Sequence, residues 1–552
     1  MSVPGSWARC STIQAARCRS SGITTTPTTT RRSVSDSGQD SGGRPPQGPV
    51  TSEASPSLTR STVSGLFWTA SSNGLNAVLK VVVLVVLARL LSPADFGIAG
   101  AALIVIGFSA IFSQLGLGPA LVQRRDLEPR HIQTAFAASL TFGLLLAGLL
   151  WVTAPAIARF FHIEGSVDVL RALAWIFPVK GLSGVAECLV QRDLRFRWLA
   201  TRDVISYALG YGLVGILLAW AGWGVWALVA AQITQTALNT AILLAFRPPA
   251  LRPLPSWRAF VELMDFGAGF TVARVANFLA NQGDNLVVGR MLGPQALGIY
   301  TRAYQLMAVP TTLFGDVLDR VLFPTMAKVQ GDAQRLAAAY LQAVASIALV
   351  MLPLGVVLTV LAPEFIIVLL GPKWVDVIPP FQLFAIGLLF RTSYKMSDSI
   401  ARATGAVYRR AWRQAIYAAL VFISAWVGSR WGVAGVAVGV LVSLVINFIL
   451  MAGLSLAVAQ TTWRRFIEAH APAALTALLA GGITWLTVTA LRYSGAGPVL
   501  RLLGTALVTA AVMALALWAR PRPLLGPYGL RMIALLGSLL PRRGIQHLRP
   551  HG

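Results

Sequence analysis

Long apolar runs, separated by short polar links, limit this chain to very few folds. From about residue 66 onward each run has roughly 18 to 25 residues, which is the length that a helix needs to cross about 30 Å of hydrocarbon. We therefore predict an all-α polytopic membrane protein with about fourteen transmembrane helices. The expected spans are residues 66–88, 97–117, 135–158, 169–190, 204–221, 224–246, 267–289, 298–322, 340–361, 379–400, 411–429, 432–457, 472–491 and 499–518.

The composition agrees with a membrane protein and argues against a water-soluble one. Hydrophobic residues make up 55% of the 552 residues and charged residues only 12%, and the mean hydropathy is +0.67. A net charge of +25 would point to nucleic acid in a soluble protein. Because a polytopic membrane protein accumulates Lys and Arg in its cytoplasmic loops, we expect no nucleic-acid partner.

The two ends of the chain differ from its apolar middle. Residues 1–62 are rich in Ser, Thr, Gly, Pro and Arg, and we expect them to form a disordered extension. The first Met after Met1 is Met264, so initiation at a non-Met codon near Val63 is an alternative in which this extension is not translated. Residues 520–552 form a basic tail, whose apolar run at 528–540 is too short to cross the bilayer and suits the inner surface.

Positive charge predicts how the spans are oriented. If the N-terminus lies in the cytoplasm, every second link is cytoplasmic, and those links together with the tails hold most of the 46 Lys and Arg residues. Since cytoplasmic loops are enriched in Lys and Arg, we expect both termini in the cytoplasm. The clusters that support this orientation include Arg124, Arg125 and Arg130, then Arg192, Arg195 and Arg197, then Arg409, Arg410 and Arg413.

A repeat divides the apolar region into two halves. The segment Leu87–Ile98 (LARLLSPADFGI) recurs as Val288–Ile299 (VGRMLGPQALGI) at an offset of 201 residues without a gap. Two copies separated by six spans cross the membrane in the same direction, so the lobes should be related by a pseudo-two-fold axis along the membrane normal. We therefore expect six-helix lobes at 63–258 and 259–460, two trailing spans at 461–519, and the tail from 520.

The same offset relates two polar stripes. It maps Asn73, Asn76 and Lys80 of the first span onto Arg274, Asn277 and Asn281 of the seventh, and the i, i+3, i+7 spacing places each trio on one helix face. A charged group at membrane depth costs at least about 2.5 to 3.5 kcal/mol and tends to face protein or water. We expect these two stripes to line a wet cleft between the lobes.

Other polar residues inside predicted spans are further candidates for the cleft lining. Asp284 extends the seventh-span stripe, and Arg391, Tyr394, Lys395 and Asp398 share one face of the tenth span. Secondary candidates are Lys180, Glu187 and Arg320. An alternative for all of these groups is structural pairing that locks the bundle, which we favour for Arg320 with Asp316 at i, i+4.

The sequence lacks the motifs of the common catalytic and metal centres. The five histidines have no partner at metal-ligand spacing, and there is no GxxxxGK[ST] phosphate loop. The longest outer link, about 363–378, is only a turn or two of chain, and we expect its Glu364 to be solvated and its Trp374 to belong to an interfacial aromatic belt. We therefore predict a transporter without cofactor or metal, and not an enzyme.

Several segments together resemble a known family. They are VVLARLLSPADFGIAG, FSQLGLGPALVQRRDL, CLVQRDLRFRWLA, NQGDNLVVGRMLGPQALGIYTRAYQLMAVP, RVLFPTMAKVQGD and EFIIVLLGPKW. Over about residues 62–460 the chain resembles the bacterial polysaccharide transport family, the O-antigen and exopolysaccharide flippases of the MATE-like superfamily. The resemblance implies a polyprenyl-pyrophosphate-linked oligosaccharide cargo, carried across the bacterial inner membrane and passed to polysaccharide polymerase or export machinery.

The polar candidates suit such a cargo. A pyrophosphate favours cations that keep their charge, such as Arg274 and Arg391, whereas sugar hydroxyls favour amides such as Asn277 and Asn281. The lipid tail would remain in the bilayer, and the head group would cross by alternating access of the two lobes. Asp284 is our candidate for proton coupling, and sodium is the alternative coupling ion.

Two further classes of function remain open from the residues. A cation-coupled multidrug exporter or a peptidoglycan-precursor flippase has the same expected fold, and a drug exporter would have a more aromatic and acidic cavity. A membrane-bound glycan polymerase or ligase would need outward-facing carboxylates or an outward-facing histidine. The outer links provide Asp95, Glu164, Asp168, Glu364 and Asp376, all of which we interpret as solvated surface charges.

Overall fold

The computed structural model describes residues 78–114, 117–124, 126–163, 165–248, 256–329 and 331–539. Every regular element in these ranges is a helix, which confirms the all-α prediction. The helices are a segment at 78–90, α2 (Pro93–Gln114), α3 (Leu117–Gln123), α4 (Pro129–Phe160), α5 (Ser166–Ala174), α6 (Ile176–Arg192), α7 (Phe196–Tyr207), η1 (Ala208–Gly215), α8 (Ile216–Trp220), α9 (Val225–Phe246), α10 (Trp257–Lys328), α11 (Ala333–Val360), α12 (Ala362–Leu369), η2 (Pro372–Val377), α13 (Ile378–Ile386), α14 (Leu388–Ala403), α15 (Val407–Gly428), η3 (Ser429–Trp431), α16 (Gly432–Val458), α17 (Trp463–Tyr493), α18 (Pro498–Ala519) and α19 (Pro521–Leu539).

The helix lengths establish a multi-pass membrane protein. Within the described ranges, nine helical stretches are long and apolar enough to cross a membrane, or ten if the bent pair Pro372–Ile386 and Leu388–Ala403 forms one span. One of the nine, Tyr408–Val458, contains two expected spans. The 72-residue α10 covers two more, at 267–289 and 298–322, which are joined at a break at Gly293. The helices are therefore consistent with about fourteen crossings.

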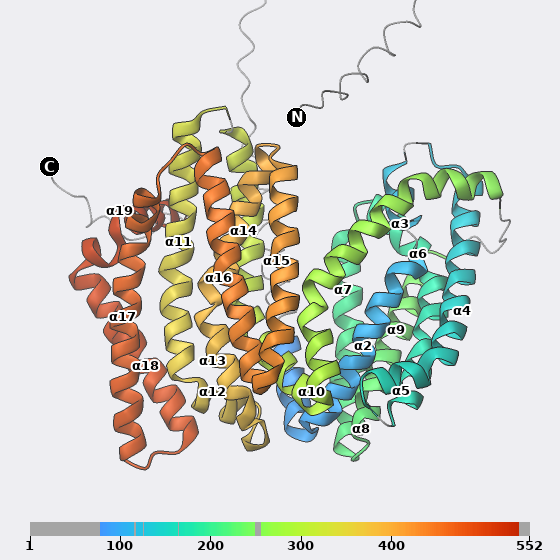
Figure 1. The fold of residues 1–552 in the computed structure, drawn as a ribbon, viewed down its shortest axis with the longest axis horizontal. Helices are drawn as coiled ribbons and strands as arrows, with labels where there is room; N and C mark the ends of the chain where they lie inside the picture. The colour runs from blue at the N-terminus through green and yellow to red at the C-terminus, as the bar shows by residue number, and fades with distance from the viewer. Residues whose placement is uncertain are drawn as a thin grey trace, which may run out of the picture. The chain divides into compact units, whose positions relative to one another are not determined.

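The helices pack as two bundles with α10 in contact with both. Figure 1 shows α2 to α9 in one bundle and α11 to α16 in the other, and α10 packs against α2, α3 and α4 as well as α13 to α16. The remaining helices α17, α18 and α19 pack together, and α17 and α19 also contact α11. Two bundles followed by a C-terminal group of helices are the arrangement expected of two MATE-like lobes with two trailing spans.

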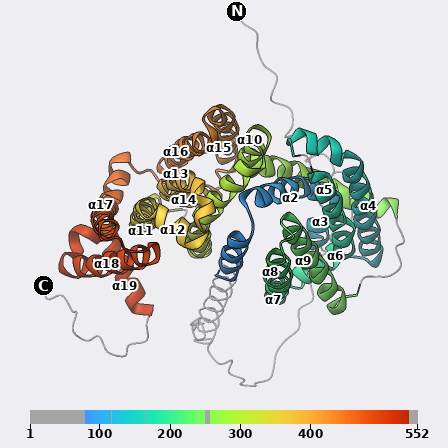
Figure 2. The ribbon, with the colours of Figure 1, turned by 90° about the horizontal axis from the view of Figure 1, so that it is seen from below.

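The two copies of the repeated segment touch each other at the start of α2 and after the break in α10. A Cβ atom added to Gly97 would lie 1.7 Å from the carbonyl oxygen of Pro294, and one added to Gly298 would lie 1.9 Å from the carbonyl oxygen of Pro93. These contacts are reciprocal, because the 201-residue offset maps Pro93 onto Pro294 and Gly97 onto Gly298. Such self-complementary pairing is the signature of a two-fold relation, here between the lobes of one chain. Figure 2 shows α2 beside α10.

Further contacts join the lobes at the same end. The Arg89 side chain donates to the carbonyl oxygens of Val368 and Leu369 in α12, at 3.2 Å for the Leu369 contact. The indole nitrogen of Trp374 in η2 donates to the carbonyl oxygen of Ala88 at 2.8 Å. The expectation that Trp374 belongs to an interfacial belt is wrong, because this side chain is fully buried and joins the two lobes.

The link at 363–378 also differs from the expected short solvated turn. It folds into α12 and η2 because Pro363 and Pro372 each stand at the start of a helix, where a missing N–H costs nothing. Glu364 is only 3% exposed and accepts two hydrogen bonds from Arg492 of α17, at 2.7 and 2.9 Å. The prediction of a solvated Glu364 is therefore wrong. A buried carboxylate needs such a partner, so the pair ties α17 to the second lobe.

The first turns of α10 precede the expected span at 267–289, and a charged cluster holds them to the first lobe. Glu262 accepts from Arg124 at 2.6 Å and lies 3.2 Å from Nε2 of His131, whose ring is fully buried. The backbone N–H of Glu128 donates to Nδ1 of His131, so Nε2 carries the proton that points at Glu262. The hydrogen bonds from His131 and Arg124 lower the pKa of Glu262, and the carboxylate stays charged as an anchor for α10.

Candidate functional site

A polar cavity of about 390 Å³ lies among α6, α7, α9 and the helix at 78–90. Its wall is mostly polar although all of these helices except the short 78–90 segment belong to apolar spans. Polar groups at such depth are expensive unless they face water or a polar ligand. The lining residues are Lys80, Lys180, Ser183, Gly184, Glu187, Arg202, Asp203, Tyr207, Gln232, Gln235, Thr236, Asn239 and Thr240.

One wall of the cavity is a polar face of α9. Five of its residues recur at i, i+3, i+4, i+7 and i+8, which places them on one side of a helix. They are Gln232, Gln235, Thr236, Asn239 and Thr240. This face was not predicted because it carries no charged residue and lies outside the repeated stripes, although the amide and hydroxyl spacing within AAQITQTALNT is a readable signal.

Three cations and two carboxylates line the cavity. Arg202 is 5% exposed, and its guanidinium lies 2.8 Å from Asp203 and 3.5 Å from Glu187. Lys80 lies 5.8 Å from the ring centroid of Tyr207. Lys80 and Lys180 both expose much of their side chains. With Arg202 neutralised by its partners, these two ammonium groups are the cations of the lining that face the open volume.

Neighbouring residues fix the uncharged part of the wall. The Tyr211 hydroxyl donates to Gln232 at 2.8 Å, and Thr240 donates to Ser183 at 3.1 Å. The Oδ1 atom of Asn239 is buried without a hydrogen-bond partner among the described residues. Buried amide oxygens are normally satisfied, so this acceptor lacks the partner that its burial calls for.

The π-helical turn η1, which follows α7, packs closely against α9 beside the cavity. A Cβ atom added to Gly210 would lie 2.9 Å from the carbonyl oxygen of Ala231 and 2.8 Å from the Cβ of Gln235. Only glycine permits this approach, and π-helical turns often occur at functional sites. This close packing holds Gln235 of α9 beside η1, and Gln235 and Tyr207 both line the cavity.

Of the two predicted stripes, only Lys80 of the first-span stripe lines this cavity. Asn73 and Asn76 lie outside the described residues, whereas Lys80 lines the cavity. Arg274 is exposed on α10 and interacts electrostatically with Cys188 of α6, next to Glu187. Asn277 and Asn281 are exposed and bonded to each other, since the Asn281 amide donates to the Asn277 side chain at 2.8 Å.

Asp284 belongs to a second polar cluster, in the other lobe. Its carboxylate is 4% exposed and accepts from the Tyr300 hydroxyl at 2.7 Å and from the backbone N–H of Asn285 at 2.8 Å. Arg391 interacts electrostatically with Asp284, and its guanidinium lies 4.5 Å from the ring centroid of Tyr304. The structure therefore brings Asp284 and Arg391 together in a buried, aromatic setting.

The other candidates on the tenth span have different surroundings. Tyr394 is half-buried and interacts electrostatically with Arg391, and Lys395 is half-buried. Asp398 forms ion pairs with Arg402, at 3.1 Å, and with Arg410 of α15. This pairing is the structural role that the sequence left as the alternative. The side chain of Arg320 lies outside the described set.

Comparisons with known proteins agree with this architecture. A family model described as "Polysaccharide biosynthesis protein" matches residues 86–379. The teichuronic acid biosynthesis protein TuaB of Bacillus subtilis (strain 168) is 28% identical over 355 residues, which cover 63% of this chain and 73% of TuaB. The succinoglycan biosynthesis transport protein ExoT of Rhizobium meliloti (strain 1021) is 29% identical over 332 residues, which cover 60% of this chain and 67% of ExoT.

Two solved structures show the same fold. The lipid II flippase MurJ in an inward closed conformation aligns with a TM-score of 0.67 at 13% identity and covers 82% of this chain and 99% of its own. An inward-facing multidrug resistance MATE family transporter of the MOP superfamily aligns with a TM-score of 0.55 at 16% identity, over 70% of this chain and 96% of its own. The MATE-like fold predicted from the sequence is confirmed.

Proposed function

Because the chain belongs to the family of polysaccharide biosynthesis proteins, we propose that it flips polyprenyl-pyrophosphate-linked oligosaccharide repeat units across the bacterial inner membrane. These units would serve lipopolysaccharide or exopolysaccharide biosynthesis and pass to polymerase or export machinery. The name of ExoT, a succinoglycan biosynthesis transport protein, supports transport rather than catalysis. The two-lobed MATE-like fold supports alternating access as the mechanism.

The polar cavity is the observation that carries this proposal. Its volume of about 390 Å³ falls within the usual range for ligand sites. Lys80 and Lys180 supply the charge that a pyrophosphate requires, and Arg274 lies near Cys188 on the α6 side. Gln235 and Asn239 offer the donors and acceptors that sugar hydroxyls require. A lining so rich in charges and amides suits a sugar pyrophosphate better than an apolar drug.

The proposed direction of transport follows from the topology. With both termini in the cytoplasm, the contacts of Gly97 with Pro294 and of Trp374 with Ala88 close the outer end of the lobes. The cavity residues Arg202 and Asp203 stand near the start of α7, toward the cytoplasmic end. We infer that this state receives the head group from the cytoplasmic leaflet and that outward release requires the contacts at the repeat to separate.

Asp284 is the proposed proton carrier. It is buried, it accepts a hydrogen bond from Tyr300, and Arg391 is its nearby cation, so a change in its protonation would alter the packing of α10 against α14. In Asp284→Asn, we expect flipping to lose its dependence on an imposed pH gradient, while flipping down the gradient of the cargo continues. The measurement compares liposomes with and without a pH difference, and a sodium gradient serves as the second arm. An unchanged pH response in Asp284→Asn would refute this role.

The function itself is tested with purified protein in liposomes. We expect the protein to move a fluorescent polyprenyl-pyrophosphate oligosaccharide from one leaflet to the other. In cells, we expect it to restore polysaccharide export when it is expressed in a strain from which the gene for this protein has been deleted. Lipid II and a cationic dye are the matched alternative cargoes. Flipping of lipid II or export of the dye without movement of the oligosaccharide would overturn the proposal in favour of a peptidoglycan-precursor flippase or a drug exporter.

A further inference from the structure

A second, apolar groove lies outside the polar site. It has a volume of about 440 Å³ and lies between α2 and α4 of the first lobe and the first half of α10. Apart from Ser109, its lining is entirely apolar, and it includes four phenylalanine side chains. Phe108, Phe160 and Leu279 at its rim are 37%, 52% and 47% exposed. Apolar side chains exposed at membrane depth suit contact with lipid, so this rim is compatible with entry of a hydrocarbon chain from the bilayer.

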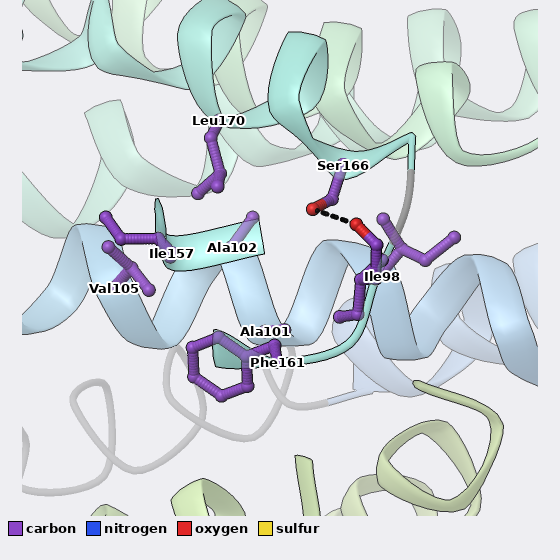
Figure 3. A pocket seen from close by; sticks show the side chains of 9 residues that line it. Ile98, Ala101, Ala102, Val105, Ile157, Phe161, Ser166 and Leu170 are labelled. Atoms are coloured by element: carbon purple, nitrogen blue, oxygen red, sulfur yellow. Dashed lines mark hydrogen bonds between the residues drawn. The ribbon is translucent and has the colours of Figure 1, made fainter. Parts of the chain in front are cut away.

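The groove is closed on its inner side. Val105, Ile157 and Phe161 line the groove and also line a small void behind it, of about 10 Å³. Figure 3 shows this void between α2, the end of α4 and the start of α5, where the Ser166 hydroxyl donates to the carbonyl oxygen of Ile163 at 2.9 Å. That volume holds about one water molecule. A chain in the groove therefore remains in contact with the bilayer and does not pass into the first lobe.

A cation stands at one end of the groove. Arg290 follows the lining residue Leu286 by one helical turn, and its guanidinium lies 5.2 Å from the ring centroid of Phe160, also a lining residue. The same guanidinium lies 2.6 Å from Nδ1 of His162. Arg290 is thus held over the mouth of an apolar groove, where hydrocarbon and phosphate of one lipid can be bound together.

We propose that this groove binds the polyprenyl chain of the cargo while Arg290 receives its phosphates. The inference rests on the proposed function and on the proposed topology, which places Arg290 at the outer end. α10 packs against helices of both lobes, so the groove lies at a seam between them, beside the cleft that a head group would cross. The aromatic wall fits the methyl-branched isoprene units, and the charge of Arg290 complements the pyrophosphate. The groove is therefore the site from which the lipid leaves into the outer leaflet.

The test fills the groove without touching the polar cavity. Leu279→Trp adds an indole at the rim, and Leu507→Trp on α18, where the side chain is 71% exposed, is the matched control. Liposome flipping is measured with two cargoes that share one head group and carry a long or a short polyprenyl chain. In Leu279→Trp we expect flipping of the long-chain cargo to be about tenfold slower, which corresponds to the loss of roughly two buried methylene contacts. For the short-chain cargo we expect less than about a twofold change. Leu507→Trp should change neither rate.

The outcomes distinguish failure of the proposed chain site from failure of the proposed transport function. Equal losses for both cargoes, or no loss for either, would overturn the proposed chain site while wild-type flipping remains intact. Absence of flipping by the wild-type protein would instead refute the proposed function. A long-chain cargo with a photoreactive group in its chain should label Phe278 or Leu286. Labelling of the same residues by a photoreactive phospholipid that excess cargo fails to displace would identify the groove as an ordinary lipid contact and overturn the inference.

Discussion

Alanine at Gly97 or at Gly298 should remove most transport activity and lower the thermal stability of the purified protein. The added methyl group would lie within 2 Å of a carbonyl oxygen, of Pro294 in the first variant and of Pro93 in the second. Neither contact can be relieved by rotating a side chain, because the obstacle is backbone. Overpacking of a tight interior typically costs about 1 to 3 kcal/mol, and here the helices α2 and α10 must also move apart.

A neighbouring glycine provides the control for this prediction. Gly100 lies one turn further along α2, and a Cβ atom added there would meet only the Leu297 side chain, at 3.9 Å. Gly100→Ala should therefore flip cargo and melt like the wild type. The three variants are compared by liposome flipping and by thermal unfolding in detergent. If Gly97→Ala and Gly298→Ala both behaved like Gly100→Ala, the lobes would not be held together through the repeat in the way we describe.

The repeat illustrates what the sequence could and could not predict. Matching Leu87–Ile98 to Val288–Ile299 revealed the duplication, and the even number of spans between the copies predicted parallel lobes. The sequence did not indicate that the two copies touch each other, because a matched Gly97 and Gly298 are equally compatible with two separate turns. The contact depends on the crossing of α2 and α10, which is a property of packing and not of either segment alone.

The pairing of polar groups that are far apart in the sequence also depends on helix packing, and this limited the prediction of polar sites. Helical spacing places Asp398 on one face with Arg391, but its pairing with Arg410 across α14 and α15 depends on how those helices pack. The sequence predicts a surface charge at Glu364 because its partner, Arg492, is 128 residues away. The face of α9 could have been found, since Gln232, Gln235 and Asn239 follow helical spacing. It was missed because uncharged side chains do not interrupt an apolar run as strongly as charged ones do.

Neutralising both lysines of the polar cavity should reduce flipping by more than about a hundredfold. A hydrogen bond to a charged group contributes about 1.5 to 3 kcal/mol, and two such losses together correspond to at least about a hundredfold in affinity. In the double variant Lys80→Gln, Lys180→Gln, the cavity retains Arg202, Glu187 and Asp203 and changes from a net positive to a net negative lining. A pyrophosphate would then meet repulsion where it now meets two cations.

The charge-preserving variant makes this prediction specific to the cargo. Lys80→Arg, Lys180→Arg keeps both positive charges, so its flipping should stay within a few-fold of the wild type, whereas a merely structural role for the ammonium groups would impair both double variants alike. Both are measured below the half-saturating cargo concentration, where a loss of affinity appears fully in the rate. Thermal unfolding should be similar for the two, because Lys80 and Lys180 are open to the cavity and carry no buried ion pair. Normal flipping by Lys80→Gln, Lys180→Gln would show that the head group crosses elsewhere, and the cluster of Asp284 and Arg391 in the second lobe would become the next site to examine.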